Sequence, residues 1–169
     1  MTSIEVHDYD PSWPALAAAA ILEVRAAAGA AVIDVEHVGS TAIPGLAAKP
    51  VIDLMASTDD LSADFAGLRD LGYRRLETGM PERLFYRREG YHLHVVTVAS
   101  WPTRNERLLR DHLLSHPSAR EEYAALKRSL AAADLDGDAY TRGKTALIQR
   151  LVDQARTARG LPTVDVWEA

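Results

Sequence analysis

Residues 35–57, VEHVGSTAIPGLAAKPVIDLMAS, place a loop of glycine, proline and polar residues between two strand-like runs. The opening letters complete an alternating, β-branched run over 31–38, AVIDVEHV, and this pattern predicts a strand. The closing letters contain residues 50–56, PVIDLMA, a short apolar run that is typical of a buried strand. Glycine, proline and polar residues are awkward choices for a purely structural connection, so this loop is predicted to hold something polar.

The loop between these two strands begins with Gly39 and Ser40. Glycine lets the backbone approach a ligand closely, and exposed N–H groups beside a hydroxyl form a phosphate-sized nest. A structural role is the alternative, in which Gly39 turns the chain and Ser40 caps the next short element. Gly39, Ser40 and the adjacent Thr41 are the predicted phosphate contacts of the loop.

An acid in the second strand accompanies this loop. Asp53 lies thirteen residues after Ser40, and an isolated acid is costly to bury unless it is paired or bound to a metal. Lys49 precedes it in AAKP. A lysine near such a nest can bind phosphate while the carboxylate holds Mg²⁺. A simple Lys49–Asp53 ion pair is the alternative.

The composition limits the class of protein. The 169 residues, 47% of them hydrophobic, suit one compact domain, predicted over 1–160 with a tail at 161–169. The net charge of −5 argues against general nucleic-acid or membrane binding, and no run approaches the roughly 20 apolar residues of a membrane span. The chain has no cysteine, which excludes disulfides and thiolate chemistry. The first residues do not resemble a signal peptide, so a cytoplasmic location is expected. No pattern predicts the oligomeric state.

The rest of the chain reads as alternating elements that become entirely helical. Propensity and spacing predict helices at 15–29, 61–72, 103–116, 118–133 and 138–158. Alternation predicts further strands at 73–77, 83–88 and 91–99, and TVDVW in the tail is predicted to pair as an edge strand. Glu89-Gly90 forms a tight turn between two of the strands. The predicted fold is α+β, a mixed central β-sheet flanked by helices, with a helical C-terminal third.

A Gly-Ser followed by an acid in a strand resembles the signature of the nucleotidyltransferase superfamily. HVGSTAIPGLAAKPVIDL, residues 37–54, more closely resembles the GrpB family, a bacterial group with that fold. The resemblance continues in order through YDPSWP, LGY, RLFYRR, HLHVV, LLRDHLLSHP, YAALKRSLA and YTRGKTALI. It covers nearly the whole chain and implies a nucleotidyltransferase-like fold.

The resemblance also implies a mechanism. Nucleotidyltransferases bind a nucleoside triphosphate through the Gly-Ser turn, and three strand-borne carboxylates hold two metal ions. Asp53 would be the first carboxylate, but Met55 stands where the second is expected. The later strand offers His92 and His94 in place of the third. This departure puts the usual two-metal transfer in doubt.

The two histidines suggest a different metal site. His92 and His94 share a strand face, and with Asp53 they would form a two-histidine, one-carboxylate site for a transition metal. His37 would be able to replace one of these ligands. The alternative is that His94 hydrogen-bonds Asp53 and orients it without a metal.

Basic residues complete the predicted site. Arg83, Arg87 and Arg88 lie in the strand before YHLHVV, while Lys127 and Lys144 lie in later helices. Arginine makes bidentate contacts with phosphate, and Arg83, Arg87 and Lys144 are predicted to bind the ligand. Ordinary solvated surface charge is the alternative. Tyr123 and Tyr140 are predicted to pack in the core, with contact to a base as the alternative.

These residues lead to a functional hypothesis, a nucleotidyltransferase-like enzyme. It would bind ATP or another phosphate-bearing small molecule, and it would transfer a nucleotidyl or activated acyl group to an unidentified acceptor. Asp53, Lys49 and His94 are the predicted catalytic residues, with Mg²⁺ or another divalent metal as cofactor. One alternative is a non-catalytic nucleotide- or coenzyme A-binding or accessory folding module, suggested by GrpB-like domains attached to dephospho-CoA kinases. The other is a metal-dependent hydrolase that uses Asp53, His92 and His94.

Overall fold

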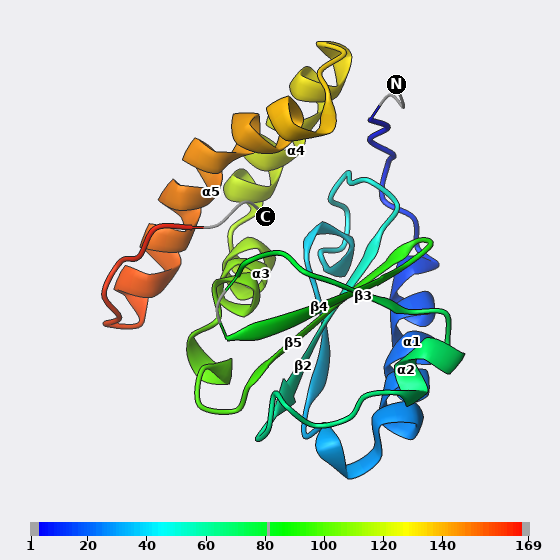
Figure 1. Ribbon diagram of the computed structural model, residues 1–169. Coiled ribbons are helices and arrows are strands. Elements are labelled where there is room, and N and C mark those ends of the chain that lie inside the picture. The colour runs from blue at the N-terminus through cyan, green and yellow to red at the C-terminus, as the bar shows by residue number, and fades with distance from the viewer. Residues whose placement is uncertain (1–3, 81, 167–169) are drawn as a thin grey trace.

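A computed structural model describes residues 4–80 and 82–166, with a five-stranded sheet at its centre (Figure 1). The strands are β1 (Val35–Val38), β2 (Ile52–Thr58), β3 (Arg74–Leu76), β4 (Arg83–Arg88) and β5 (Tyr91–Thr97). Their order in the sheet is β1-β2-β5-β4-β3. β2 and β5 run parallel, and the other neighbouring pairs run antiparallel. The sheet is therefore mixed, and the predicted α+β fold is confirmed.

The helices lie on both sides of this sheet. They are α1 (Trp13–Ala28), α2 (Gly67–Asp70), α3 (Asn105–Ser115), α4 (Pro117–Ala132) and α5 (Gly137–Ala158). Figure 1 shows α1 and α2 against one face, α3 on the other side, and the α4–α5 pair packed beyond α3. Three short 3₁₀ turns complete the order, at η1 (Gly29–Ala31), η2 (Ser40–Ala42) and η3 (Trp101–Thr103). The predicted helical C-terminal third is confirmed.

The strand and turn predictions hold best where side chains alternate strictly. β4 coincides with the predicted strand at 83–88, and Arg88 pairs with Tyr91 across the predicted Glu89-Gly90 turn. Gly90 adopts a φ of 78°, which the turn requires and which glycine reaches at little cost. The first predicted strand is shorter than expected, because its opening residues belong to η1 and to an extended connection.

The predicted helix at 61–72 is wrong over most of its length, since α2 has only four residues. Aspartate side chains organise the preceding segment into turns instead. The backbone N–H of Ser62 donates to Asp60 Oδ1, and that of Ala66 donates to Asp64 Oδ1, both at 2.9 Å. Such local bonds give the backbone an alternative to the helical ladder, so the helix starts late.

Helix α1 is more apolar than the sequence reading allowed. Residues 13–31 have a mean hydropathy of 1.4, so by length and composition alone this stretch is long enough to cross a membrane. The expectation that no run approaches a span is therefore corrected. One side of the helix, with Trp13, Ala17, Ala20 and Val24, is buried in the core against the sheet. Only 17% of the apolar window is buried, and Leu16 and Leu22 on the same helix are exposed, so this packing covers one side of the helix alone.

The two faces of the sheet have different cores. The face beneath α1 and α2 carries the main hydrophobic core, which includes Leu54, Leu93 and Val95. On the other face only a small apolar cluster forms, around Val38, Met55 and Val96. A separate core joins the three C-terminal helices to the β1–β2 loop. Space for a polar site therefore remains between the sheet and those helices.

The C-terminal tail follows α5 without forming the predicted edge strand in its described part. The side-chain amide of Gln149 donates to the carbonyl of Val164 at 2.8 Å and accepts from the backbone N–H of Val166 at 2.9 Å. One glutamine side chain thus supplies the backbone partners that a neighbouring strand would have given. The end of TVDVW, from Trp167, lies outside the described residues.

Candidate functional site

A cavity of about 170 Å³ lies where the β1–β2 loop meets β2, β5 and the C-terminal helices. Seven predicted site residues line it: Gly39, Ser40, Thr41, Lys49, Asp53, His92 and Lys144. Segments far apart in the sequence therefore converge on the β1–β2 loop. Arg83, Arg87 and His94 do not line this cavity.

The Gly39 turn brings the loop directly against Asp53. The backbone of Gly39 has a φ of 75°, a left-handed conformation that side-chain-bearing residues rarely adopt. A Cβ at this position would lie 2.5 Å from Asp53 Oδ2. Val38 pairs with Asp53 in the β1–β2 register, so the carboxylate is fixed beside the turn. Glycine is therefore required here for two independent reasons.

Three lysines surround this carboxylate in the cavity. Lys127 and Lys144 are only 3% and 5% exposed, an uncommon degree of burial for lysine. The Nζ of Lys127 donates a hydrogen bond to Ser40 Oγ and lies 4.3 Å from the ring centroid of Tyr123. Lys49 and Lys144 both lie close to one aromatic ring, with Nζ 5.2 Å and 5.0 Å from the ring centroid of Tyr140.

Burial and mutual repulsion make these ammonium groups costly in the ligand-free protein. Burial, reinforced by the charges of Lys144 and Lys49, lowers the pKa of Lys127 to about 7, although Asp53 opposes the shift. Burial and the charge of Lys49 lower the pKa of Lys144 to about 8. A polyanion placed beside Lys127 and Lys144 would favour their charged forms. The cavity is thus electrostatically prepared for an anionic ligand.

Asp53 is held by a different histidine from the one expected. His92 Nδ1 lies 3.2 Å from Asp53 Oδ1. His94 Nδ1 instead lies 3.2 Å from a guanidinium nitrogen of Arg83. The expectation that His94 orients Asp53 is therefore corrected, and the reason is the β2–β5 register, in which Asp53 is opposite His92 and Met55 is opposite His94.

The residues predicted to hold a metal do not converge. Burial, together with the positive charge of Arg83, lowers the pKa of His94 to about 4, and this ring is directed to Arg83 rather than to Asp53. His37 Nε2 lies 2.9 Å from Thr41 Oγ1 instead. Within residues 4–80 and 82–166, no three histidine, aspartate or glutamate side chains are grouped as metal ligands. The described residues therefore do not fit a metal held by protein ligands alone.

The predicted arginines have other partners or positions. Arg83 donates to Glu106 Oε1 at 2.8 Å, and its side chain is only 9% exposed. Arg87 is exposed on β4. Lys49 does not form the alternative ion pair, because in the described part of the chain the salt-bridge partner of Asp53 is His92. Lysines, rather than arginines, therefore supply most of the positive charge of the cavity.

Two residues of the cavity wall, Glu106 and Arg110, were not indicated by the sequence. Lys127 also lines the cavity, although the sequence places it only among the basic residues of the later helices. Tyr123 and Tyr140 are buried, as their predicted packing requires, and they too line the cavity. A usable signal was present for Lys127. A tyrosine precedes each buried lysine by four residues, in YAALK of α4 and YTRGK of α5. Positions i and i+4 share a helix face, so the repeated pattern indicates two helices that present the same pair to one site.

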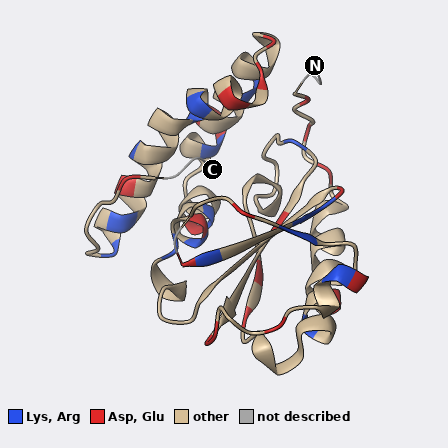
Figure 2. Ribbon diagram, viewed as in Figure 1, with Lys and Arg blue, Asp and Glu red and all other residues tan. Residues whose placement is uncertain are grey.

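A second network fixes the helix that carries part of this wall. Arg107 and Arg110 of α3 both donate to Glu36 Oε1 of β1, at 2.9 Å and 3.0 Å. Burial alone would raise the pKa of Glu36, but the two guanidinium groups hold it below its usual value. Figure 2 shows basic and acidic positions interspersed along α3, α4 and α5, and this network explains part of that pattern. The carboxylate of Glu36 is thus structural.

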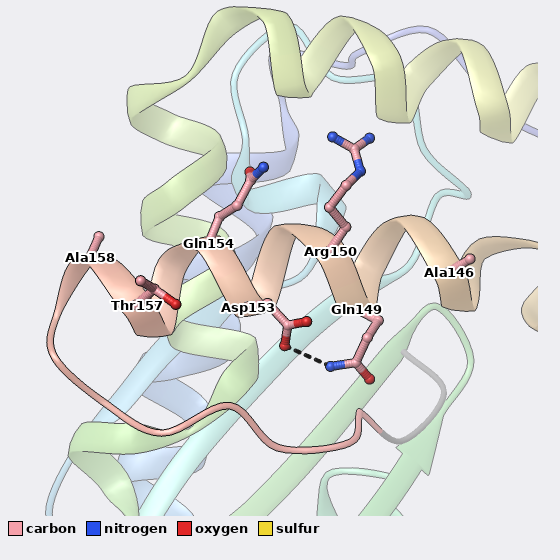
Figure 3. A pocket seen from close by; sticks show the side chains of 7 residues that line it. All are labelled: Ala146, Gln149, Arg150, Asp153, Gln154, Thr157 and Ala158. Carbon is pink, nitrogen blue, oxygen red and sulfur yellow. Dashed lines mark hydrogen bonds between the residues drawn. The ribbon is translucent and has the colours of Figure 1, made fainter.

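A larger, open hollow of about 630 Å³ lies along α5 (Figure 3). Several of its polar side chains already have partners: Gln149 donates to Asp153 at 2.8 Å, and Arg150 is paired with Glu122 of α4. Its charges are of both signs and are solvated. No predicted site residue lines it, so the cavity at the sheet is the better site.

Comparison with known proteins identifies the family. The family model described as GrpB protein matches residues 3–154. A UPF0157 protein of Pseudomonas aeruginosa is 35% identical over 95% of this chain and 71% of its own length. A protein named dephospho-CoA kinase, from Mycolicibacterium paratuberculosis, is also 35% identical, over 80% of this chain but 42% of the kinase. The crystal structure of the conserved protein GrpB from Enterococcus faecalis superposes with a TM-score of 0.84 at 26% identity, over 92% of this chain and 99% of that one. The chain belongs to the GrpB family.

Proposed function

We propose that the cavity binds a nucleotide, such as ATP, or another phosphate-bearing small molecule. The observation that carries this proposal is the convergence of Lys49, Lys127 and Lys144 around the Gly39-Ser40 turn. Two of these lysines, Lys127 and Lys144, are almost fully buried and have lowered pKa values, so an added anion would stabilise their charged forms. Phosphate is the biological anion that suits several ammonium donors together with a glycine turn.

We further propose that the protein is a nucleotidyltransferase-like enzyme. Ser40 and the backbone of Gly39 would hold the phosphate chain, and the lysines would stabilise negative charge as it moves to the leaving group. Asp53 would bind a divalent ion that enters together with the nucleotide, since the described residues do not form a metal site of their own. The lysines would then neutralise charge that other enzymes of this class leave to a second metal.

A non-catalytic binding module is the second candidate function. Met55, which stands in the place of the second carboxylate, is fully buried in an apolar cluster and cannot act on a ligand. The relative named dephospho-CoA kinase is more than twice as long as the segment that this chain matches. A domain of this kind beside a kinase would bind a nucleotide or coenzyme A without transferring anything.

Calorimetric titration of ATP with and without Mg²⁺, into wild type and Asp53→Asn, tests both candidates. An enzyme that uses a nucleotide-borne metal should bind ATP more tightly with Mg²⁺, and this advantage should disappear in Asp53→Asn. A binding module should show no advantage of Mg²⁺ in either protein. Failure of ATP, inorganic phosphate and pyrophosphate to bind under any condition would contradict the proposed function itself.

The pKa values of Lys127 and Lys144 predict that the affinity for an anion depends on pH, even when the anion itself does not titrate. Sulfate is a suitable probe because its charge does not change in this range. With pKa values near 7 and 8, Lys127 and Lys144 lose their protons as the pH rises, so sulfate affinity should fall between about pH 7 and pH 9. Titrations in buffers of different ionisation enthalpy should show proton uptake on binding. An affinity that is constant over this range would contradict the assignment.

A further inference from the structure

Two unsatisfied polar atoms belong to residues in the wall of this cavity. Buried side-chain oxygens without a hydrogen-bond partner occur at three places in the described residues: Tyr73 Oη, Tyr140 Oη and Glu106 Oε2. Tyr140 and Glu106 both line the lysine cavity, whereas Tyr73 lies in the core on the opposite side of the sheet. Buried polar groups in folded proteins are nearly always satisfied, so two exceptions at one cavity indicate a missing partner there.

Glu106 is the more informative of the two because it is an acid in a site built for anions. It stands in the first turn of α3, and its Oε1 accepts from Arg83 at 2.8 Å. Burial would raise the pKa of Glu106, but the charge of Arg83 and the proximity of His94 hold it below the usual value. The carboxylate is therefore ionised, with one oxygen paired and the other without a donor in the described part of the chain.

Glu106 also stands between two cavities. A second cavity of about 320 Å³ adjoins the first and shares Glu106 and Leu109 with it. Arg83 and Arg104 belong to the wall of this second cavity. Glu106 and Leu109 thus form a wall that the two cavities share, and a ligand group beside this wall would lie next to Glu106.

A negative carboxylate repels phosphate, so Glu106 cannot be a phosphate contact. As an ionised carboxylate it accepts hydrogen bonds and donates none, and no metal-ligand group occurs in the described residues, so the partner that we consider is an O–H or N–H group. We propose that Glu106 determines ligand specificity: it accepts a hydrogen bond from a hydroxyl or amino group carried by a ligand whose phosphate lies among the three lysines. This inference rests on the proposed function and narrows it to phosphate esters that bear such a donor. Bare polyphosphate lacks one, whereas a nucleotide or a hydroxylated or aminated acceptor has one.

Three matched series of phosphate monoesters test the inference: n-alkyl phosphates, ω-hydroxyalkyl phosphates and ω-aminoalkyl phosphates, with chains of two to six carbons. All carry the same phosphate and differ only in the end group. A hydrogen bond to a charged group corresponds to about a tenfold gain in affinity or more. At one chain length the hydroxyl or the amino ester should therefore bind wild type about tenfold more tightly than the alkyl ester. If the hydroxyalkyl series shows the gain, the donor is a hydroxyl group. If the aminoalkyl series shows it, the donor is an amino group.

Variants assign the gain to Glu106. Glu106→Gln should remove the advantage of the donor-bearing ester and leave the alkyl ester bound at least as tightly as in wild type. Glu121→Gln makes the same chemical change at an exposed position of α4 and should preserve the advantage. If loss of the Arg83 partner unfolds Glu106→Gln, Glu106→Asp retains the charge and withdraws the oxygen by one methylene, which should also reduce the advantage. Thermal melts check each variant.

The titrations give different results if Glu106 has no role and if the cavity does not bind phosphate at all. Equal affinity of the three series for wild type at every chain length would overturn the role of Glu106 and leave phosphate binding intact. An advantage that survives both Glu106 variants would do the same. Absence of binding by every ester would overturn the proposed function, and the inference with it.

Discussion

Replacement of Lys127 by methionine should weaken the binding of ATP or inorganic phosphate by about tenfold to a hundredfold, the effect of losing a charged hydrogen-bond donor. The same change should make the ligand-free protein more stable. The pKa of Lys127 falls from its ordinary value of 10.5 to about 7 on burial, so the folded state disfavours the proton that the unfolded state keeps. Methionine has a similar length and no charge, and the free energy of unfolding at pH 7 should rise by on the order of 2 kcal/mol.

The sign of the pH dependence distinguishes this explanation from a simple packing effect. Because the folded pKa of Lys127 is below the unfolded one, the wild-type free energy of unfolding should rise as the pH increases from about 7 towards 10. Lys127→Met should show a shallower rise, with the remainder due to Lys144. Urea denaturation at several pH values measures both slopes.

Arg128→Met provides the matched control, because Arg128 is the next residue on α4 and its side chain is half exposed. It should change neither phosphate affinity nor the pH slope appreciably. A Lys127→Met protein that binds phosphate as tightly as wild type would show that Lys127 has only a packing role. A variant that is less stable than wild type at pH 7 would contradict the electrostatic cost.

Secondary structure that depends on residues adjacent in the sequence was predictable, and most of the fold follows from these elements. The strand at 83–88 and its tight turn at Glu89-Gly90 are encoded by alternation and a glycine. The segment at 61–72 also has apolar residues at helical spacing, yet Asp60 and Asp64 capture backbone N–H groups and delay the helix. The spacing of apolar residues carries no information on these side-chain bonds to the backbone, so the helix predicted at 61–72 was wrong over most of its length.

The site was predictable on one side only. One side of the site lies within fifteen residues of sequence, with Gly39, Ser40, Lys49 and Asp53. Their types and spacing together predict a phosphate site. Lys127 comes from a helix whose position depends on the packing of the whole C-terminal third, so no local pattern ties it to Ser40.

The histidine assignment failed for a different physical reason. His92 and His94 share a face of β5, and a period of two cannot tell which of them is level with Asp53. That choice belongs to the β2–β5 register, in which Asp53 is opposite His92. Register is set by tertiary pairing, so the sequence places both histidines beside Asp53, whereas the structure brings His92 to it and His94 to Arg83.

Gly39→Ala should displace Asp53 and remove nucleotide binding, and Gly45→Ala should not. Both glycines have positive φ, 75° and 81°, so each alanine variant pays a backbone cost of about 1–2 kcal/mol. Only at Gly39 would the new Cβ meet another group, at 2.5 Å from Asp53 Oδ2, whereas nothing lies within 4 Å at Gly45. Asp53 must turn away, which breaks its contact with His92 and moves its charge relative to the lysines. The stability difference between the two variants, from urea denaturation, isolates that contact from backbone strain. ATP titration of both variants tests whether the position of Asp53 matters for binding. Loss of affinity is expected in Gly39→Ala alone. Equal affinity in the two variants would show that the position of Asp53 is irrelevant to the ligand.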